Sequence, residues 1–273
     1  MVDVVSNAIF VNLNKIKGFN MMKKLVIVAA LLAASNANAA LNTGDIAFTA
    51  FNADEDGWAL TTFVDIAANT KIFFSDNEWN GTAFNTGESF SSWTSGTSIV
   101  SAGSVVRFSA IEKATAAASV GIFMAETVTG SANRGISATA DTIYAYLGTS
   151  ATAPTSFLTA ISNAASITGA TDGGLINTGL VAGSTATQLA SSTDFAQYTG
   201  IRSGQTTFAD YKPLVANVTA NWTNGGDGAF ELTVPNTTAF SVVTTPVPEP
   251  ETYGMLVAGL GLVGFVSRRR KAV

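Results

Sequence analysis

The sequence predicts an all-β fold, an antiparallel β-sandwich, for residues 40–245 of the 273-residue chain. Short runs of β-branched and aromatic residues recur along this region, and Gly, Asn, Asp or Ser bounds each run. Glycine turns follow one another closely, for example at Gly81, Gly87, Gly96 and Gly103. This spacing is typical of an all-β domain and not of βαβ units.

Six segments carry the strand pattern most clearly, and we expect each to form a strand of the sandwich. They are Asp45–Phe51, Trp58–Ile66, Lys71–Ser75, Ser104–Phe108, Asp141–Leu147 and Thr238–Val243. Two short helices are also expected. Pro154–Ala164 has a proline in its first turn and apolar residues at helical spacing, and Gln205–Tyr211 is expected to form a helix beneath Trp222.

The composition excludes several classes of enzyme, because the chain contains neither Cys nor His. Thiol nucleophiles, His-based triads and zinc sites with nitrogen or sulfur ligands are unavailable. The fold cannot depend on disulfides, and a body of about 200 residues does not need them. Residues 40–245 hold 16 acidic and six basic residues, a net charge of −10. Such a body repels phosphate backbones, so we expect no nucleic-acid partner.

Residues 21–39 have the three parts of a secretory signal peptide. Two lysines precede a ten-residue apolar run, and small residues follow it. Ala37 and Ala39 fit the Ala-x-Ala rule, so we expect an N-terminal signal helix that signal peptidase removes before Ala40. Residues 1–20 precede this signal, and a start codon assigned too early explains them best.

The end of the chain, residues 246–273, combines three elements in a fixed order. An extended, proline-containing segment comes first, because each proline disfavours helix; it consists of Val247, Pro248, Glu249 and Pro250. Residues 253–266 follow as one expected transmembrane helix of about 21 Å, which bilayer thinning or snorkelling would fit to a core of about 30 Å. A basic cluster closes the chain and is expected to stay cytoplasmic, which leaves the body outside; it consists of Arg268, Arg269, Arg270 and Lys271.

The same residues closely resemble the PEP-CTERM sorting signal of exopolysaccharide-producing Gram-negative bacteria. The matching parts are Pro248-Glu249-Pro250, Gly259-Leu260-Gly261-Leu262 and Arg268-Arg269-Arg270. The resemblance implies an exported protein that its C-terminal helix anchors in the inner membrane. It also implies an exosortase, a membrane Cys transpeptidase-like enzyme, that recognises Pro-Glu-Pro and passes the body to the cell surface or extracellular matrix. Exopolysaccharide is the further partner that this family suggests, and a plain single-span anchor is the alternative.

The body is similar to a recurring extracellular β-domain of bacterial surface proteins, which is distantly similar to the lamin-tail, immunoglobulin-like fold. The segments that carry this likeness include Gly44–Thr49, Ile72–Trp79 and Asp141–Gly148. The likeness extends over nearly all of Leu41–Val243, and its motifs are structural. It therefore implies a fold and brings no established activity.

An acidic turn at residues 52–57 suggests a calcium loop, because Asp54 and Asp56 place carboxylates around a glycine. The twelfth position of an EF-hand needs a carboxylate and is Phe63 here, which excludes an EF-hand. A looser calcium site would join these carboxylates to a distant one such as Asp76. The alternative is a solvated Asx-type turn between two strands. We expect no other cofactor.

Asp76 and Glu78 raise the alternative of a carbohydrate-active hydrolase, because Trp79 beside them could stack on a sugar. Glycosidases need two carboxyl groups that face each other across a cleft, and residues two apart in a strand are too local to form one. We therefore favour a non-enzymatic, exported protein of the cell envelope or extracellular matrix that acts as a binding or structural surface module. A calcium-dependent adhesin module is a third hypothesis.

Overall fold

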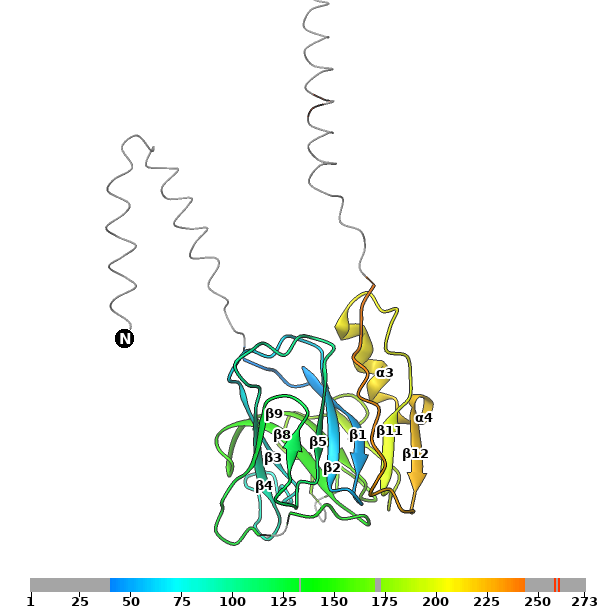
Figure 1. Ribbon diagram of the computed structural model, residues 1–273. Coiled ribbons are helices and arrows are strands. Elements are labelled where there is room, and N and C mark those ends of the chain that lie inside the picture. Colours follow the sequence, from blue (N-terminus) through cyan, green and yellow to red (C-terminus); the bar gives the residue numbers. More distant parts are fainter. Residues whose placement is uncertain (1–39, 133, 170–172, 244–257, 259, 261–273) are drawn as a thin grey trace, which may run out of the picture. The chain divides into compact units, whose positions relative to one another are not determined.

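The computed structural model describes residues 40–132, 134–169 and 173–243, together with Ala258 and Leu260 (Figure 1). The strands in these ranges are β1 (Ile46–Asn52), β2 (Gly57–Thr62), β3 (Lys71–Ser75), β4 (Phe90–Thr94), β5 (Val105–Ser109), β6 (Ala117–Ala118), β7 (Ile122–Ala125), β8 (Thr142–Ser150), β9 (Ala153–Ser162), β10 (Ala186–Gln188), β11 (Phe195–Tyr198) and β12 (Trp222–Gly226). Apart from Ala258 and Leu260, the described helical residues form a 3-10 turn, η1 (Phe208–Tyr211), and two short α-helices, α3 (Lys212–Ala216) and α4 (Val218–Asn221).

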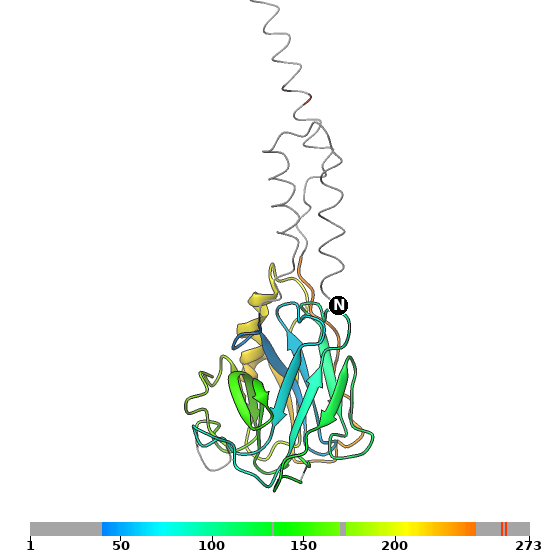
Figure 2. The same cartoon turned by 90° about the vertical axis from the view of Figure 1, so that its left-hand side faces the viewer.

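The strands form two six-stranded sheets. The first sheet has the order β12-β11-β1-β2-β5-β6 and the second the order β10-β9-β8-β3-β4-β7. Neighbouring strands are antiparallel except β9 and β10, which are parallel. Figure 2 views the domain from the side where β3 and β4, in cyan, run beside the green strands. The predicted mostly-β, two-sheet fold is confirmed, and its likeness to the lamin tail stays a prediction.

An aromatic cluster fills the space between the two sheets. Phe108 on β5 is fully buried, and its ring lies 5.5 Å from that of Trp58, its register partner on β2. From the second sheet, the rings of Phe74, Trp93 and Phe123 lie 5.1, 6.0 and 5.5 Å from the ring of Phe108. These residues belong to one buried core, which holds the sheets face to face.

Both sheets are also covered on their outer faces. Tyr144 and Tyr146 on β8 point into a second cluster with Phe157 and with residues of the loops around Trp79 and Leu180. On the first sheet, a third cluster joins strand residues to helix and tail residues; its buried members are Ala50, Ala59, Phe63, Val105, Tyr198, Tyr211, Val215 and Phe240. Burial on two faces explains why β1, β2 and β8 read as nearly continuous apolar runs and not as strict alternations.

The segment that follows β12 lies along β11 and covers the third cluster; Figure 1 shows it in orange. Phe240 is 3% exposed, and its amide donates to the carbonyl of Gly103 at 2.8 Å. The guanidinium of Arg202 lies 4.7 Å from the Phe240 ring and donates to the carbonyl of Thr238 at 2.7 Å. The Tyr211 hydroxyl donates to the carbonyl of Ser241 at 2.6 Å. We call this arrangement the Phe240 clamp.

The strand predicted at Thr238–Val243 is wrong. Only an isolated parallel bridge between Gln205 and Val242 forms there, flanked by backbone bonds such as that from the Val243 amide to the Gln205 carbonyl at 2.8 Å. The segment crosses the face of a sheet instead of extending its edge. It therefore has no neighbouring strand with which to form a full ladder.

The helix predicted at Pro154–Ala164 is also wrong, because this segment forms β9 and pairs antiparallel with β8. The register shifts where Ala145 pairs with Thr159 and Tyr146 with Phe157, so Leu158 is the extra residue of a β-bulge. A bulge resets the two-residue alternation. It leaves the apolar residues at 157, 158 and 161, a spacing that imitates one face of a helix.

The other five predicted strands and the second predicted helix are present, although their first and last residues differ from those predicted. Five of the predicted strands correspond to β1, β2, β3, β5 and β8, and Ile66, predicted as the end of the second, lies beyond it in a bridge with Val100. The helix predicted from Gln205 begins later, at Phe208, and continues directly into α3. Trp222 packs against it as expected, and its Nε1 donates to the carbonyl of Val215 at 2.8 Å.

Candidate functional site

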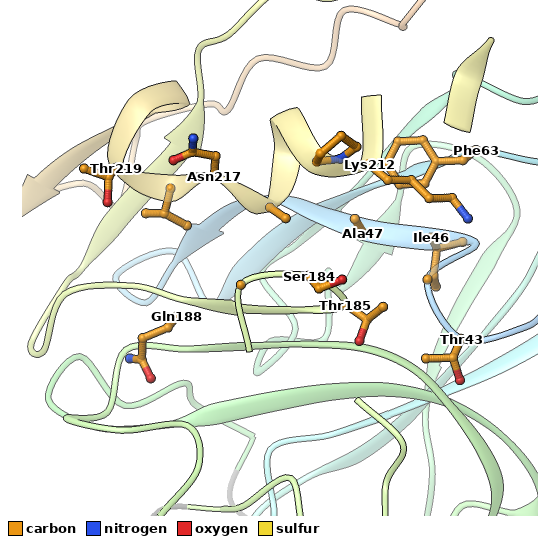
Figure 3. Close-up of a pocket in the computed structure, with 15 residues that line it drawn as sticks. Thr43, Ile46, Ala47, Phe63, Ser184, Thr185, Gln188, Lys212, Asn217 and Thr219 are labelled. Carbon is orange, nitrogen blue, oxygen red and sulfur yellow. The ribbon is translucent and has the colours of Figure 1, made fainter. Parts of the chain in front are cut away.

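A cleft of about 750 Å³ lies between the start of β1, the turn before β10 and the helices α3 and α4. In Figure 3, Lys212, Asn217 and Thr219 lie on the helical side, and Ser184, Thr185 and Gln188 lie on the opposite side. The lining consists of Thr43, Gly44, Ile46, Ala47, Phe63, Gly183, Ser184, Thr185, Gln188, Lys212, Pro213, Ala216, Asn217, Val218 and Thr219. A cleft of this size accommodates a small molecule or a few units of a polymer.

The floor of the cleft is fixed by contacts between the first residues of the domain and β9. The Thr43 hydroxyl donates to the carbonyl of Phe157 at 2.8 Å, and the Gly44 amide donates to that of Leu158 at 2.8 Å. Gly44 has a φ of +79°, and a Cβ there would lie 2.9 Å from a methyl carbon of Thr185. Glycine is required at this position because both the backbone conformation and the close approach exclude a side chain.

The charge in the cleft is balanced. Lys212 is the one ionisable residue among those that line it, and its Nζ lies 3.3 Å from Oδ1 of Asp45. The Lys212 ammonium also lies 5.7 Å from the centre of the Phe63 ring. Because the ammonium already has an anionic partner, the cleft offers a nearly neutral surface and little attraction for an anion.

Several polar groups of the cleft are available to a ligand. Gln188 is occupied, since its Oε1 accepts from the Ile167 amide and its Nε2 donates to the carbonyls of Ala164 and Leu189. The hydroxyls of Ser184 and Thr219 and the side-chain amide nitrogen of Asn217 make no hydrogen bond to another described residue, and all three residues are exposed. The oxygen of Asn217 accepts from the Ala220 amide at 3.2 Å, which orients this side chain. The cleft thus presents hydroxyl and amide groups, the chemistry that binds neutral polar molecules.

The carboxylates predicted for calcium lie in the turn between β1 and β2, where each holds a different segment. Oδ2 of Asp54 accepts from the Phe230 amide, and Oδ1 of Asp56 accepts from the Ile136 amide, both at 2.6 Å. The Glu55 amide donates to the side chain of Asn52 at 3.1 Å, as in the Asx-type alternative. Within the described ranges, no three Asp, Glu, Cys or His residues are grouped so that they could hold a metal ion. Calcium binding by Asp54 and Asp56 therefore stays a prediction without a third ligand.

The residues considered for glycoside hydrolysis do not form a shared site. Strand β3 ends at Ser75, so Asp76 and Glu78 do not continue its alternation; Asp76 is 4% exposed, whereas Glu78 is partly exposed and accepts from the Asn85 amide side chain. Trp79 is buried and its Nε1 donates to the carbonyl of Ile176 at 2.8 Å. Its ring packs against core aromatics and is unavailable for stacking on a sugar.

The fold brings Asp76 close to a carboxylate that sequence reasoning did not select, Asp141, just before β8. The cleft residues Ser184, Asn217 and Thr219 were missed as well. Short polar loops carry no periodic signal, and only the pairing of β9 with β10 and the packing of α3 reveal that they meet.

The predicted sorting residues lie mostly outside the described residues. This holds for Ala37 and Ala39, for Val247 to Pro250, and for Arg268 to Lys271, while Ala40 is described and exposed. The predicted transmembrane segment falls outside too, except Ala258 and Leu260, which are helical. The helices within the described ranges do not combine the length and apolar character that crossing a bilayer requires.

Comparison of the chain with curated protein sequences and with solved structures gave no significant match. A family model does match its C-terminal end, and the match coincides with the predicted sorting segment. Residues 246–271 fit the PEP-CTERM protein-sorting motif. The chain therefore carries the signal of an exported protein that is anchored in the membrane and then processed by an exosortase.

Proposed function

We propose that this protein is a non-enzymatic surface module of the cell envelope or extracellular matrix, and that its β-domain binds a neutral, hydroxyl-rich polymer in the cleft beside α3 and α4. Exopolysaccharide is the candidate polymer. Signal peptidase would act before Ala40, and exosortase processing at Pro248-Glu249-Pro250 would then deliver the domain to the outside. Calcium is not required for this role.

The observation that carries the proposal is the chemistry of the cleft lining. It offers the hydroxyls of Ser184 and Thr219 and the amide of Asn217, and its one charge, on Lys212, is balanced by Asp45. None of the residues that line it is Asp or Glu. Glycoside hydrolysis requires two carboxyl groups that flank the bond to be cleaved. The lining therefore favours binding over hydrolysis.

The burial of two carboxyl groups elsewhere in the domain, those of Asp76 and Asp141, also favours binding over hydrolysis. Asp76 and Asp141 are distant in sequence and close in the fold, as a hydrolase would need, but each is only 4% exposed. The space next to Asp76 is too small for a water molecule, which hydrolysis would consume. This pair has no access to a polymer outside the domain.

A co-sedimentation assay with polysaccharide extracted from the producing cells tests the proposal. We expect the wild-type protein to bind and a Ser184→Trp variant to bind at least tenfold more weakly, because an indole at this position would obstruct the cleft. The matched control is Ser150→Trp, an exposed serine in the β8–β9 hairpin outside the cleft, which should bind as wild type does. Equal binding by both variants would count against the cleft, and shortening of the polymer by the wild type would count against a non-enzymatic role.

A further inference from the structure

Two buried carboxyl groups lie together at one end of the second sheet. Asp76 directly follows β3, and Asp141 directly precedes β8. Ser75 pairs with Tyr144 in the antiparallel register, so the end of β3 lies beside the start of β8. Each aspartate is 4% exposed. Neither takes part in any ion pair formed by the described residues.

The two aspartates have four carboxyl oxygens, and one of them differs from the other three because it accepts no hydrogen bond from a described residue. Oδ1 of Asp76 accepts from the amide and from the hydroxyl of Ser89, both at 2.7 Å. Oδ2 of Asp141 accepts from the Ser137 amide at 3.0 Å, and its Oδ1 accepts from the Thr142 amide at 2.7 Å. Oδ2 of Asp76 is buried and has no hydrogen-bond partner among the described residues.

Among the described residues, this oxygen adjoins no space for a water molecule and no cation in an ion pair. Asp76 borders a narrow space that Trp58, Ile111, Ile136 and Ile143 also line and that cannot admit a water molecule. A charged oxygen without a partner in such a place is strongly disfavoured, so the group is more stable when it is neutral. A carboxyl group becomes neutral by holding a proton.

The charged groups around the pair are acidic. Asp141 faces Asp76 from the start of β8, Glu78 belongs to the segment after β3, and Glu88 lies just before β4. The residues contributed by β2 and by the segments at 111 and 136, namely Trp58, Ile111 and Ile136, carry no charge. Burial, followed by the charge of Asp76, raises the pKa of Asp141 well above its ordinary value, and burial raises the pKa of Asp76 to about 6.

We propose that Asp76 and Asp141 share one proton at neutral pH, held between Oδ2 of Asp76 and the carboxyl group of Asp141, and that this end of the domain is built for mildly acidic surroundings. Both oxygens of Asp141 already accept N–H groups, so Oδ2 of Asp76 is the position left for the proton. The shared proton removes one of two facing negative charges and gives the orphaned oxygen a partner. Its loss leaves two unscreened charges in the interior.

The direction in which stability changes with pH follows from the raised pKa values of the two aspartates. In the folded state both pKa values lie above that of an unfolded aspartate, so the folded protein binds more protons than the unfolded one at intermediate pH. The stabilising contribution is complete below about pH 4 and declines as the pH rises through the folded-state values. One extra proton on the folded state makes the unfolding constant rise about tenfold per pH unit.

Unfolding of the purified full-length protein in detergent micelles, followed between pH 5 and pH 8, tests this. We expect the melting temperature of the wild type to fall by roughly 3–6 °C per pH unit over this range. Asp76→Asn places an uncharged amide beside Asp141, so its melting temperature should vary less with pH and exceed that of the wild type at pH 8. The dependence that remains comes from Asp141 and from Asp56, since burial raises the pKa of Asp56 to about 6. The control is Asp194→Asn, which alters another buried aspartate, 5% exposed, and should keep the wild-type dependence.

Infrared spectroscopy of the wild type at pH 7 supplies a direct readout that does not need a folded variant. A protonated carboxyl band should be present, and it should lose intensity in Asp76→Asn, where no proton is shared, while keeping its intensity in Asp194→Asn. Absence of this band in the wild type, or a melting temperature that does not fall with pH, would overturn the proposal. Stabilisation of the wild type but not of Asp76→Asn by calcium chloride at pH 8 would overturn it too, because a cation would then fill the site.

Discussion

Replacing Phe108 by alanine tests whether one aromatic cluster holds the two sheets together. The Phe108 side chain is fully buried, and its ring contacts Trp58 in its own sheet and Phe74, Trp93 and Phe123 in the other, with centroids 5.1–6.0 Å away. Truncation of a buried phenylalanine costs about 3–5 kcal/mol through lost transfer energy and the cavity that remains. We expect the upper part of this range, because the lost ring has four aromatic partners.

Thermal unfolding followed by tryptophan fluorescence measures this loss. At about 2–4 °C per kcal/mol for a domain of this size, the melting temperature should fall by roughly 8–20 °C. Phe108→Leu keeps much of the volume and should cost about 1–2 kcal/mol, which provides a folded variant if the alanine protein is too unstable. The control is Phe230→Ala, a partly exposed ring that stacks on Phe195 at 5.4 Å and should cost about 1 kcal/mol. A similar loss for Phe108→Ala and Phe230→Ala would refute a shared core centred on Phe108.

Three further substitutions have expected outcomes. Gly121→Ala should destabilise the protein by about 2 kcal/mol or more in thermal unfolding, because φ is +77° and a Cβ would overlap the carbonyl oxygen of Thr94; a change below about 0.5 kcal/mol would contradict this. Lys71→Met should cost at most about 1 kcal/mol and less in high salt, since its 2.7 Å ion pair with Glu126 is partly exposed; a large loss would mean that the pair is not solvated. Glu249→Ala should leave membrane insertion intact but block processing, so immunoblots of fractionated cells should show a larger membrane-bound form than the wild type, and bands of equal size would refute processing at this motif.

The sequence predicts those elements whose local residue pattern matches the structure that they adopt in the folded domain. The strands β1, β3 and β8 combine strand-forming residues with clear turn residues at their ends, and their positions were predicted to within a few residues. The C-terminal motif was predictable because its three elements are contiguous in the chain. Such features need no knowledge of distant contacts.

The sequence misleads where a tertiary contact determines the local structure. The bulge at Leu158 gave β9 a helical spacing, and the last segment, around Phe240, has strand-like composition but lies across a sheet. The cleft could not be predicted because it joins residue 43 to residues 184 and 217, all in short polar segments. The pairing of Asp76 with Asp141 has the same origin, since it depends on the register between β3 and β8.

The Phe240 clamp has a mechanical consequence, because it comes directly before the sorting segment. An attachment through the C-terminal tail transmits any pulling force on the protein to Val243 first. From there the load passes to the bond with Gln205, then to the Phe240 ring and the guanidinium of Arg202 that holds it. All the described strands, β1 to β12, precede this point in the chain and bear no load until the ring is extracted. The side chains of the Phe240 clamp therefore set the force at which the tethered domain begins to unfold. An Arg202→Ala change would lower this force without altering the cleft.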